Sequence, residues 1–109
     1  MMIPQNKVYT KEDLIKLTSD SLGYDIHEVR AIIHRFEEHV FDIFTKVNSN
    51  TSVSVRMFQG INFDGTYAPA KQKKNNLTGI IENVPEKVKL KANITRNYIE
   101  HVNAKADLN

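Results

Sequence analysis

The chain has 109 residues, 40% of them hydrophobic and 26% charged, which is the composition of a globular protein and excludes a disordered or collagen-like chain. The absence of cysteine excludes disulfides, thiol catalysis and cysteine-based zinc sites. The apolar runs are short and no hydrophobic signal segment stands at the N-terminus, so we expect one cytoplasmic domain, residues 1–109, with no contact to membranes.

A first helix is predicted over about residues 11–22. Thr10 can cap it, and Glu12 and Asp13 suit the positive end of the helix dipole. Gly23 can take the left-handed conformation that ends many helices. Residues 1–9 are expected to form a flexible terminus.

A second, longer helix is predicted from the periodicity between residues 26 and 47. Its apolar residues recur at alternating spacings of three and four, and they form a broad stripe. The first helix is too short to cover this stripe, so we expect a sheet and a second copy of the chain to do so. The stripe consists of Ile26, Val29, Ile33, Phe36, Val40, Ile43 and Val47, widened by Ile32, Phe41 and Phe44.

The strands are predicted from residue 52 onwards. Residues 52–58 alternate between apolar and polar side chains, Gly60 marks a turn, and an extended run follows. Pro69 and Pro85 each remove a backbone donor, which confines their strands to an edge or a protrusion. We therefore expect a hairpin arm over about residues 66–90.

A short helix is predicted after the arm. Thr95 can open it, and Tyr98, Ile99 and Val102 supply its apolar side. Residues 103–109 are expected to form a flexible tail.

Positive charge is concentrated in and beside the arm. Residues 1–50 carry six Lys or Arg against eight Asp or Glu, whereas residues 51–109 carry nine against five. Six lysines and two glutamates lie between residues 68 and 91. A focused basic region on a nearly neutral chain indicates a polyanionic partner.

The order of these elements resembles the HU/integration-host-factor family of bacterial DNA-binding, histone-like proteins, from Thr10 to Val102. The segment Lys11-Glu12-Asp13-Leu14-Ile15 is similar to the family's Lys-x-x-Leu-Ile opening. The segment Val55-Arg56-Met57-Phe58-Gln59-Gly60-Ile61-Asn62-Phe63 stands where the family has an apolar strand followed by Gly-Phe-Gly-Thr-Phe. At the arm tip, Asn75-Asn76-Leu77-Thr78-Gly79 stands where the family has Asn-Pro-x-Thr-Gly.

The resemblance implies an α+β fold: two N-terminal helices, an antiparallel sheet with a protruding β-hairpin arm, and a short C-terminal helix, in an intertwined homodimer. It also implies a nucleoid-associated protein whose arms enter the minor groove of double-stranded DNA and bend or compact it, largely without sequence specificity. The divergence of the motifs suits a member from a phage or mobile element.

Two positions depart from the family pattern. Ile61 replaces the second glycine, and Asn76 replaces the proline that family members insert between base pairs. An asparagine is a poor wedge, so the tip is expected to grip a groove more than to separate bases. Leu77 could act as the wedge instead, or it could pack across the hairpin or remain in water.

The candidate DNA-binding residues are the lysines of the arm and returning strand, the tip, and three outlying cations. Strand alternation places Lys87, Lys89 and Lys91 on one face, and the arm lysines are expected along one side of the arm. Lys11 is included because a lysine of the family motif contacts phosphate. The full set is Lys11, Arg56, Lys71, Lys73, Lys74, Asn75, Asn76, Leu77, Thr78, Lys87, Lys89, Lys91 and Arg96.

No catalytic motif or metal site is predicted. His34 and His39 are five residues apart, not the four that align two zinc ligands on a helix. Nucleophile elbows and phosphate-binding glycine loops are missing from the sequence, so we expect no enzyme activity, cofactor or small-molecule substrate. The alternative function is a protein-interaction module of the same fold with weak or lost DNA binding, favoured by the acidic first half and Glu82 in the arm.

Overall fold

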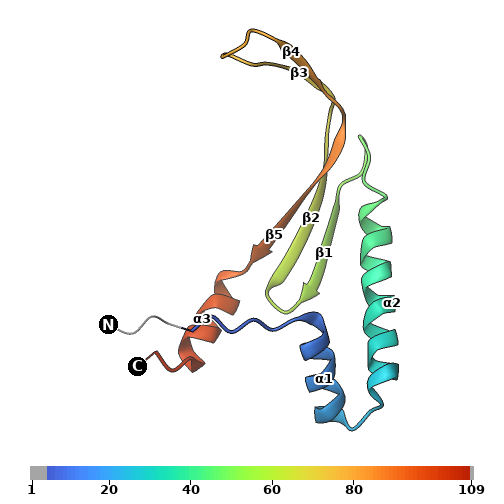
Figure 1. Ribbon diagram of the computed structural model, residues 1–109, viewed down its shortest axis with the longest axis vertical. Helices are drawn as coiled ribbons and strands as arrows, with labels where there is room; N and C mark the ends of the chain where they lie inside the picture. The colour runs from blue at the N-terminus through green and yellow to red at the C-terminus, as the bar shows by residue number, and fades with distance from the viewer. Residues whose placement is uncertain (1–4, 109) are drawn as a thin grey trace. The chain divides into compact units, whose positions relative to one another are not determined.

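The computed structural model describes residues 5–108, so the outermost ends of the two expected flexible termini, residues 1–4 and 109, lie outside the described part. Its elements confirm the predicted α+β, HU-like fold of two helices, an antiparallel sheet with a hairpin, and a C-terminal helix (Figure 1). The chain divides into two compact units at His39 and Val40, within the second helix. The elements are α1 (Lys11–Leu22), α2 (Ile26–Phe44), β1 (Val53–Phe58), β2 (Ile61–Ala68), β3 (Lys71–Lys74), β4 (Ile81–Val84), β5 (Lys87–Ile94) and α3 (Arg96–Lys105).

Helix α1 begins at the predicted cap. The hydroxyl of Thr10 accepts a hydrogen bond from the Asp13 amide at 3.2 Å, and the Asp13 carboxylate accepts one from the Thr10 amide at 2.9 Å. This reciprocal capping box satisfies two amides that have no partner inside the helix. At the other end Gly23 has a φ of 73°, and its amide donates to the Ser19 carbonyl at 2.9 Å.

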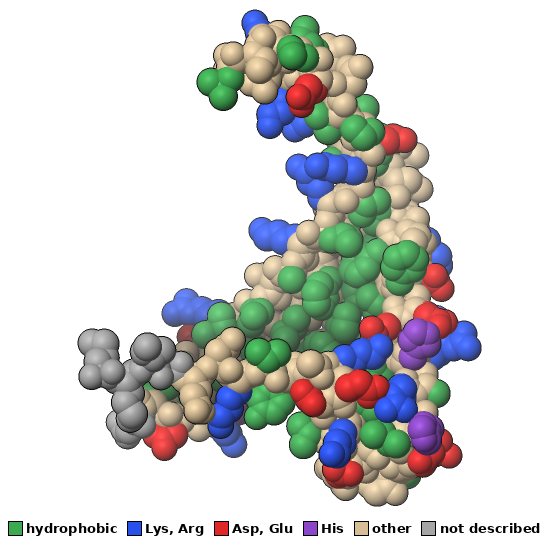
Figure 2. Space-filling model, viewed as in Figure 1, with side chains coloured by type: hydrophobic (Ala, Val, Ile, Leu, Met, Phe, Trp, Pro, Cys, Tyr) green, Lys and Arg blue, Asp and Glu red, His purple; other side chains and the backbone are tan. Residues whose placement is uncertain are grey.

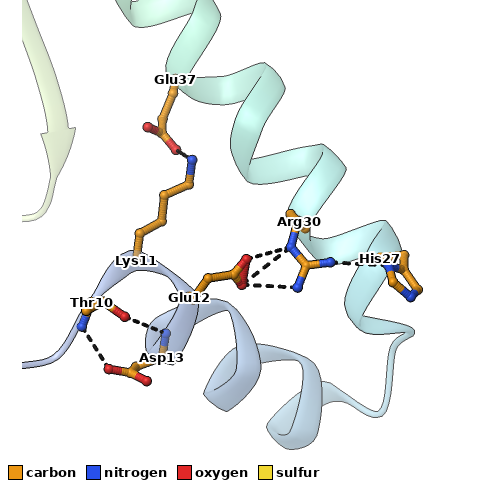
Figure 3. A network of polar contacts seen from close by, with 7 residues as sticks. All are labelled: Thr10, Lys11, Glu12, Asp13, His27, Arg30 and Glu37. Carbon is orange, nitrogen blue, oxygen red and sulfur yellow. Dashed lines mark hydrogen bonds and ion pairs between the residues drawn. The ribbon is translucent and has the colours of Figure 1, made fainter.

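Ion pairs join α1 to the first part of α2 (Figure 3). The Arg30 guanidinium lies 2.6 Å from the Glu12 carboxylate, and Lys11 Nζ lies 2.5 Å from Glu37 Oε1. The hydrogen bond from Arg30 lowers the pKa of the Glu12 carboxyl below its ordinary value. The apolar centre of this unit is small, with Ile15 and Val29 as its buried hydrophobic side chains.

Helix α2 ends at Phe44, three residues before the predicted end at Val47. The Thr45 hydroxyl donates to the Asp42 carbonyl at 2.6 Å, and the amides of Lys46 and Val47 bond to carbonyls three residues back. Such bonds tighten the last turn and terminate an α-helix. The side chain of Val47 is nevertheless buried, as its place in the apolar stripe indicated.

Strands β1, β2 and β5 form an antiparallel sheet in the order β1-β2-β5. Gly65, on the central strand, packs against the C-terminal end of α2 and the residues that follow it. A Cβ atom at this position would be 3.0 Å from Val47 Cγ2 and 3.2 Å from Phe44 Cδ1. Glycine therefore permits the close approach of helix and strand at this point.

The arm, residues 66–90, continues from the central strand and β5. Strand β2 pairs with β1 only as far as Gly65, and beyond it with β5 alone. The ladder is then interrupted on both strands at Pro69 and Pro85, and β3 and β4 form a separate two-stranded sheet. The prolines thus stand where the two-stranded ribbon is broken. A proline has no amide hydrogen to donate to the neighbouring strand, so the ladder cannot continue through it.

Helix α3 begins after Thr95, whose hydroxyl accepts from the Tyr98 amide at 3.3 Å. It continues through Lys105, so residues 103–105, expected in a flexible tail, are helical. Ala104 and Lys105 favour a helix, and a basic last turn suits the negative end of the dipole. Between residues 5 and 108, no helix combines the length and apolarity needed to cross a membrane.

Candidate nucleic-acid interface

The register of the three-stranded sheet separates polar from apolar side chains. Directly opposed residues of antiparallel strands share a face, and successive residues alternate between faces. The apolar face carries Val53, Val55, Phe63, Gly65, Tyr67, Val88, Leu90 and Ala92. The polar face carries Ser54, Arg56, Asn62, Asp64, Thr66, Ala68, Lys87, Lys89, Lys91 and Asn93.

Four cations share the polar face of the sheet. Lys87, Lys89 and Lys91 follow one another along β5, and Arg56 stands on the same face of β1. All four side chains are exposed, and none forms an ion pair within residues 5–108. The three lysines line a surface groove on this face, and Lys and Arg side chains project along β5 and the arm in Figure 2. Because none of the four is held in an ion pair within the described chain, these cations can meet an external anion.

The lysines of β3 are divided between the two faces of the hairpin. All three stand on one strand of the arm, but Lys71 and Lys73 share one face and Lys74 lies on the other. The reason is strand alternation across Lys71-Gln72-Lys73-Lys74. Lys73 also stands directly opposite Glu82.

The arm tip is a turn held by both backbone and side-chain hydrogen bonds. The Asn75 amide donates to the Ile80 carbonyl at 2.9 Å, and the Gly79 amide donates to the Asn75 carbonyl at 2.7 Å. Asn75 Oδ1 accepts from the Leu77 amide at 2.9 Å, and Thr78 Oγ1 accepts from the Ile80 amide at 3.3 Å. Two of the predicted contact residues, Asn75 and Thr78, are therefore used in part to shape the turn.

Asn76 and Leu77 occupy the corner of this turn with exposed side chains. Leu77 is 96% exposed, the highest value among the large hydrophobic residues of the described chain. It does not pack across the hairpin, which was one of the two alternatives to a wedge. An amide and an isobutyl group are thus presented together at the end of the arm.

Two predicted cations are already paired within the chain. Lys11 lies against Glu37, and Arg96 Nε lies 3.0 Å from Glu100 Oε1 on the next turn of α3. Both pairs are exposed, where such pairs contribute little stability and exchange readily. A phosphate would have to replace a carboxylate at each of these positions.

Two polar pairs on β2 were missed from the sequence. The Ser54 hydroxyl donates to Asp64 Oδ1 at 2.7 Å, and the Tyr67 hydroxyl donates to Glu86 Oε2 at 2.6 Å. The second bond raises the pKa of Tyr67 above its ordinary value. Alternation along residues 61–68 indicates the face of Asp64, but its neighbour Ser54 depends on the register set by the turn at Gly60.

The polar face and the arm present exposed cations and no cluster of metal-ligand type, that is, no group of three His, Asp or Glu side chains, within residues 5–108. Exposed cations on a strand and a projecting hairpin can hold an extended anion at several separate points.

The sequence matches no protein-family model and no curated protein. Among solved structures, the chain is similar to HU from Anabaena in a co-crystal with DNA, at 15% sequence identity and a TM-score of 0.59. The match covers 86% of this chain and 97% of that one. At this identity the likeness establishes the HU-like fold.

Proposed function

We propose that the protein binds double-stranded DNA as a homodimer, with one arm from each chain in the minor groove, and bends or compacts the duplex. The observation that carries this proposal is the row of unpaired lysines on the polar face, Lys87, Lys89 and Lys91, next to the lysines of β3. The similar fold of Anabaena HU, which was crystallised with DNA, supports it. Its place of action would be the nucleoid in the cytoplasm.

The spacing of the cations suits a duplex better than a small anion. Alternate residues of a strand are about 6.7 Å apart, so three lysines span about 13 Å. Over that distance a duplex offers several phosphates on each strand. Binding of this kind depends on the DNA backbone, so it would be salt-sensitive and largely independent of sequence.

The tip would then lie in the groove. Asn76 presents an amide that can bond to the acceptors on the minor-groove floor, and Leu77 supplies an apolar contact. Since no proline stands at the tip, we propose that the arm grips the groove and bends DNA without the sharp kink of a proline wedge.

The dimer is proposed from exposed apolar surface. Within residues 5–108, Ile15, Val29 and Val47 are the buried hydrophobic side chains, whereas Ile32 and Phe41 on α2 are each 68% exposed. An interlocked second copy would cover the apolar stripe of α2 and the apolar face of the sheet.

A second function is favoured by the paired cations. Glu37, Glu82 and Glu100 stand beside or opposite Lys11, Lys73 and Arg96. These acids would weaken DNA binding and suit a protein-interaction module of the same fold. Salt dependence distinguishes the two functions, because only phosphate neutralisation releases counterions from DNA.

The test is a duplex-binding titration at several salt concentrations. We expect the affinity to fall steeply with salt, and replacement of Lys71, Lys73 and Lys74 by alanine to flatten the log–log slope by about 0.9 for each phosphate that the variant no longer neutralises. Replacement of Lys7, Lys16 and Lys46, which carry the same total charge outside the arm, serves as the control. Equal slopes for the arm variant and the wild type would exclude the arm from the interface.

A further inference from the structure

One acidic residue lies inside the basic face of the sheet. Asp64, on the central strand, stands directly between Ser54 on β1 and Lys91 on β5 in the register. It lines the same surface groove as Lys87, Lys89 and Lys91. A carboxylate in this position faces whatever the lysines bind.

A hydrogen bond from Ser54 holds the Asp64 carboxylate on the polar face. The Ser54 hydroxyl donates to Asp64 Oδ1 at 2.7 Å, and no Lys or Arg forms an ion pair with Asp64 within residues 5–108. The negative charge is therefore placed among cations without being used to bind one of them. If Asp64 served only to accept the hydrogen bond from the Ser54 hydroxyl, an asparagine would serve equally well, because its amide oxygen is also an acceptor.

The position divides the basic face into two parts. Towards the arm, the next rows contain Lys89 and then Lys87, opposite the uncharged Thr66 and Ala68. Away from the arm, the next row contains Arg56, Asn62 and Asn93. A phosphate strand lying along β5 would meet two unopposed lysines and then a carboxylate. The phosphate and the Asp64 carboxylate are both negative, and such charges repel each other appreciably in a partly desolvated interface.

We propose that Asp64 is a specificity-determining residue that ends the phosphate-binding surface at the row of Ser54, Asp64 and Lys91. Lys87 and Lys89 bind the duplex backbone, and the Asp64 carboxylate repels the backbone before it reaches Arg56. Asp64 thereby limits the length of DNA held by the sheet and keeps the affinity below what its cations would allow. This inference rests on the proposed DNA binding and adds the boundary of the bound segment.

The test compares Asp64→Asn with Asp20→Asn, which removes an equal charge from the exposed surface of α1. We expect Asp64→Asn to tighten duplex binding about tenfold at low salt and to steepen the salt slope by about 0.9 per chain, because Arg56, beyond the row of Asp64, can then bind a phosphate. Hydroxyl-radical footprinting should show a longer protected segment. The Asp20→Asn variant should bind and protect DNA as the wild type does.

A third variant separates charge from structure. Ser54→Ala removes the hydroxyl but keeps the carboxylate, so its affinity and footprint should stay within twofold of the wild type. Equal behaviour of Asp64→Asn and Asp20→Asn, or tightening by Ser54→Ala as large as that by Asp64→Asn, would overturn the proposal. Absence of duplex binding by every variant at low salt would contradict the proposed function itself, and this inference with it.

Discussion

Gly60 closes the turn between β1 and β2 and lies against the first turn of α3. Its φ is 89°, and an added Cβ would overlap Tyr98 Cβ and lie 2.7 Å from Tyr98 Cγ. Its carbonyl also accepts the Thr95 amide at 2.7 Å. One small residue therefore fixes how the C-terminal helix starts from the sheet.

We predict that Gly60→Ala destabilises the protein by about 2–4 kcal/mol, because a left-handed backbone and a steric overlap each cost about 1–2 kcal/mol. Urea unfolding at fixed protein concentration measures the loss. Gly23→Ala is the matched control, since Gly23 has a φ of 73° but nothing within 4 Å of the added atom. Equal losses in the two variants would show that the close approach of Tyr98 has no role.

The capping box of α1 predicts a pH dependence. Hydrogen bonds from the backbone and side chain of Thr10 lower the pKa of Asp13 below its ordinary value of 3.8. A depressed carboxyl pKa stabilises the folded state above the ordinary value, and this contribution is lost as the pH falls through the folded pKa. Asp13→Asn should therefore lower the urea midpoint at pH 6, with the difference shrinking between pH 4 and pH 2. A constant difference across that range would contradict the linkage.

At the scale of elements, the proposed DNA binding makes the arm tip the part that would deform the duplex. Asn76 stands at the position of the family's wedge proline, and its neighbour Leu77 is fully in solvent. We predict that Asn76→Pro increases the bend of a bound duplex, because a rigid apolar ring can enter a base step where an amide prefers hydrogen bonds. Energy transfer between dyes at the duplex ends measures the bend.

The control for this prediction is Asn76→Ala, which removes the amide without supplying a wedge. It should leave the bend unchanged and weaken binding modestly. A proline variant with the wild-type bend angle would show that the tip does not reach the base steps.

Elements with local signals could be predicted from the sequence, and contacts between distant segments could not. Thr10 and Gly23 mark the ends of α1 through their own side-chain and backbone preferences, and both predictions are confirmed. The close approach at Gly65 and the row through Asp64 depend on a register that no single segment contains. The lysines of β3 show both cases: alternation within residues 71–74 is enough to divide them between two faces, but the place of Lys73 opposite Glu82 depends on pairing with β4.

At the scale of the whole molecule, the apolar surface of α2 determines whether the chain is stable alone. Phe41 is a large hydrophobic side chain in solvent on the helix that carries the apolar stripe. If a second copy covers this stripe, unfolding must separate two chains, and the melting temperature must rise with protein concentration. A hundredfold increase in concentration should therefore shift the melting temperature by several degrees.

We predict that Phe41→Asp abolishes the dimer, because a buried, unpaired carboxylate at an interface costs more than the apolar side chain contributed. Sedimentation should then find the variant as a monomer or unfolded chain, with duplex affinity reduced because one chain supplies only one arm. Leu108→Asp, at a residue 80% exposed outside the described helices and strands, places the same charge away from α2 and should sediment as the wild type does. A stable wild-type monomer whose melting temperature is independent of concentration would exclude the dimer, and with it the two-armed grip on DNA.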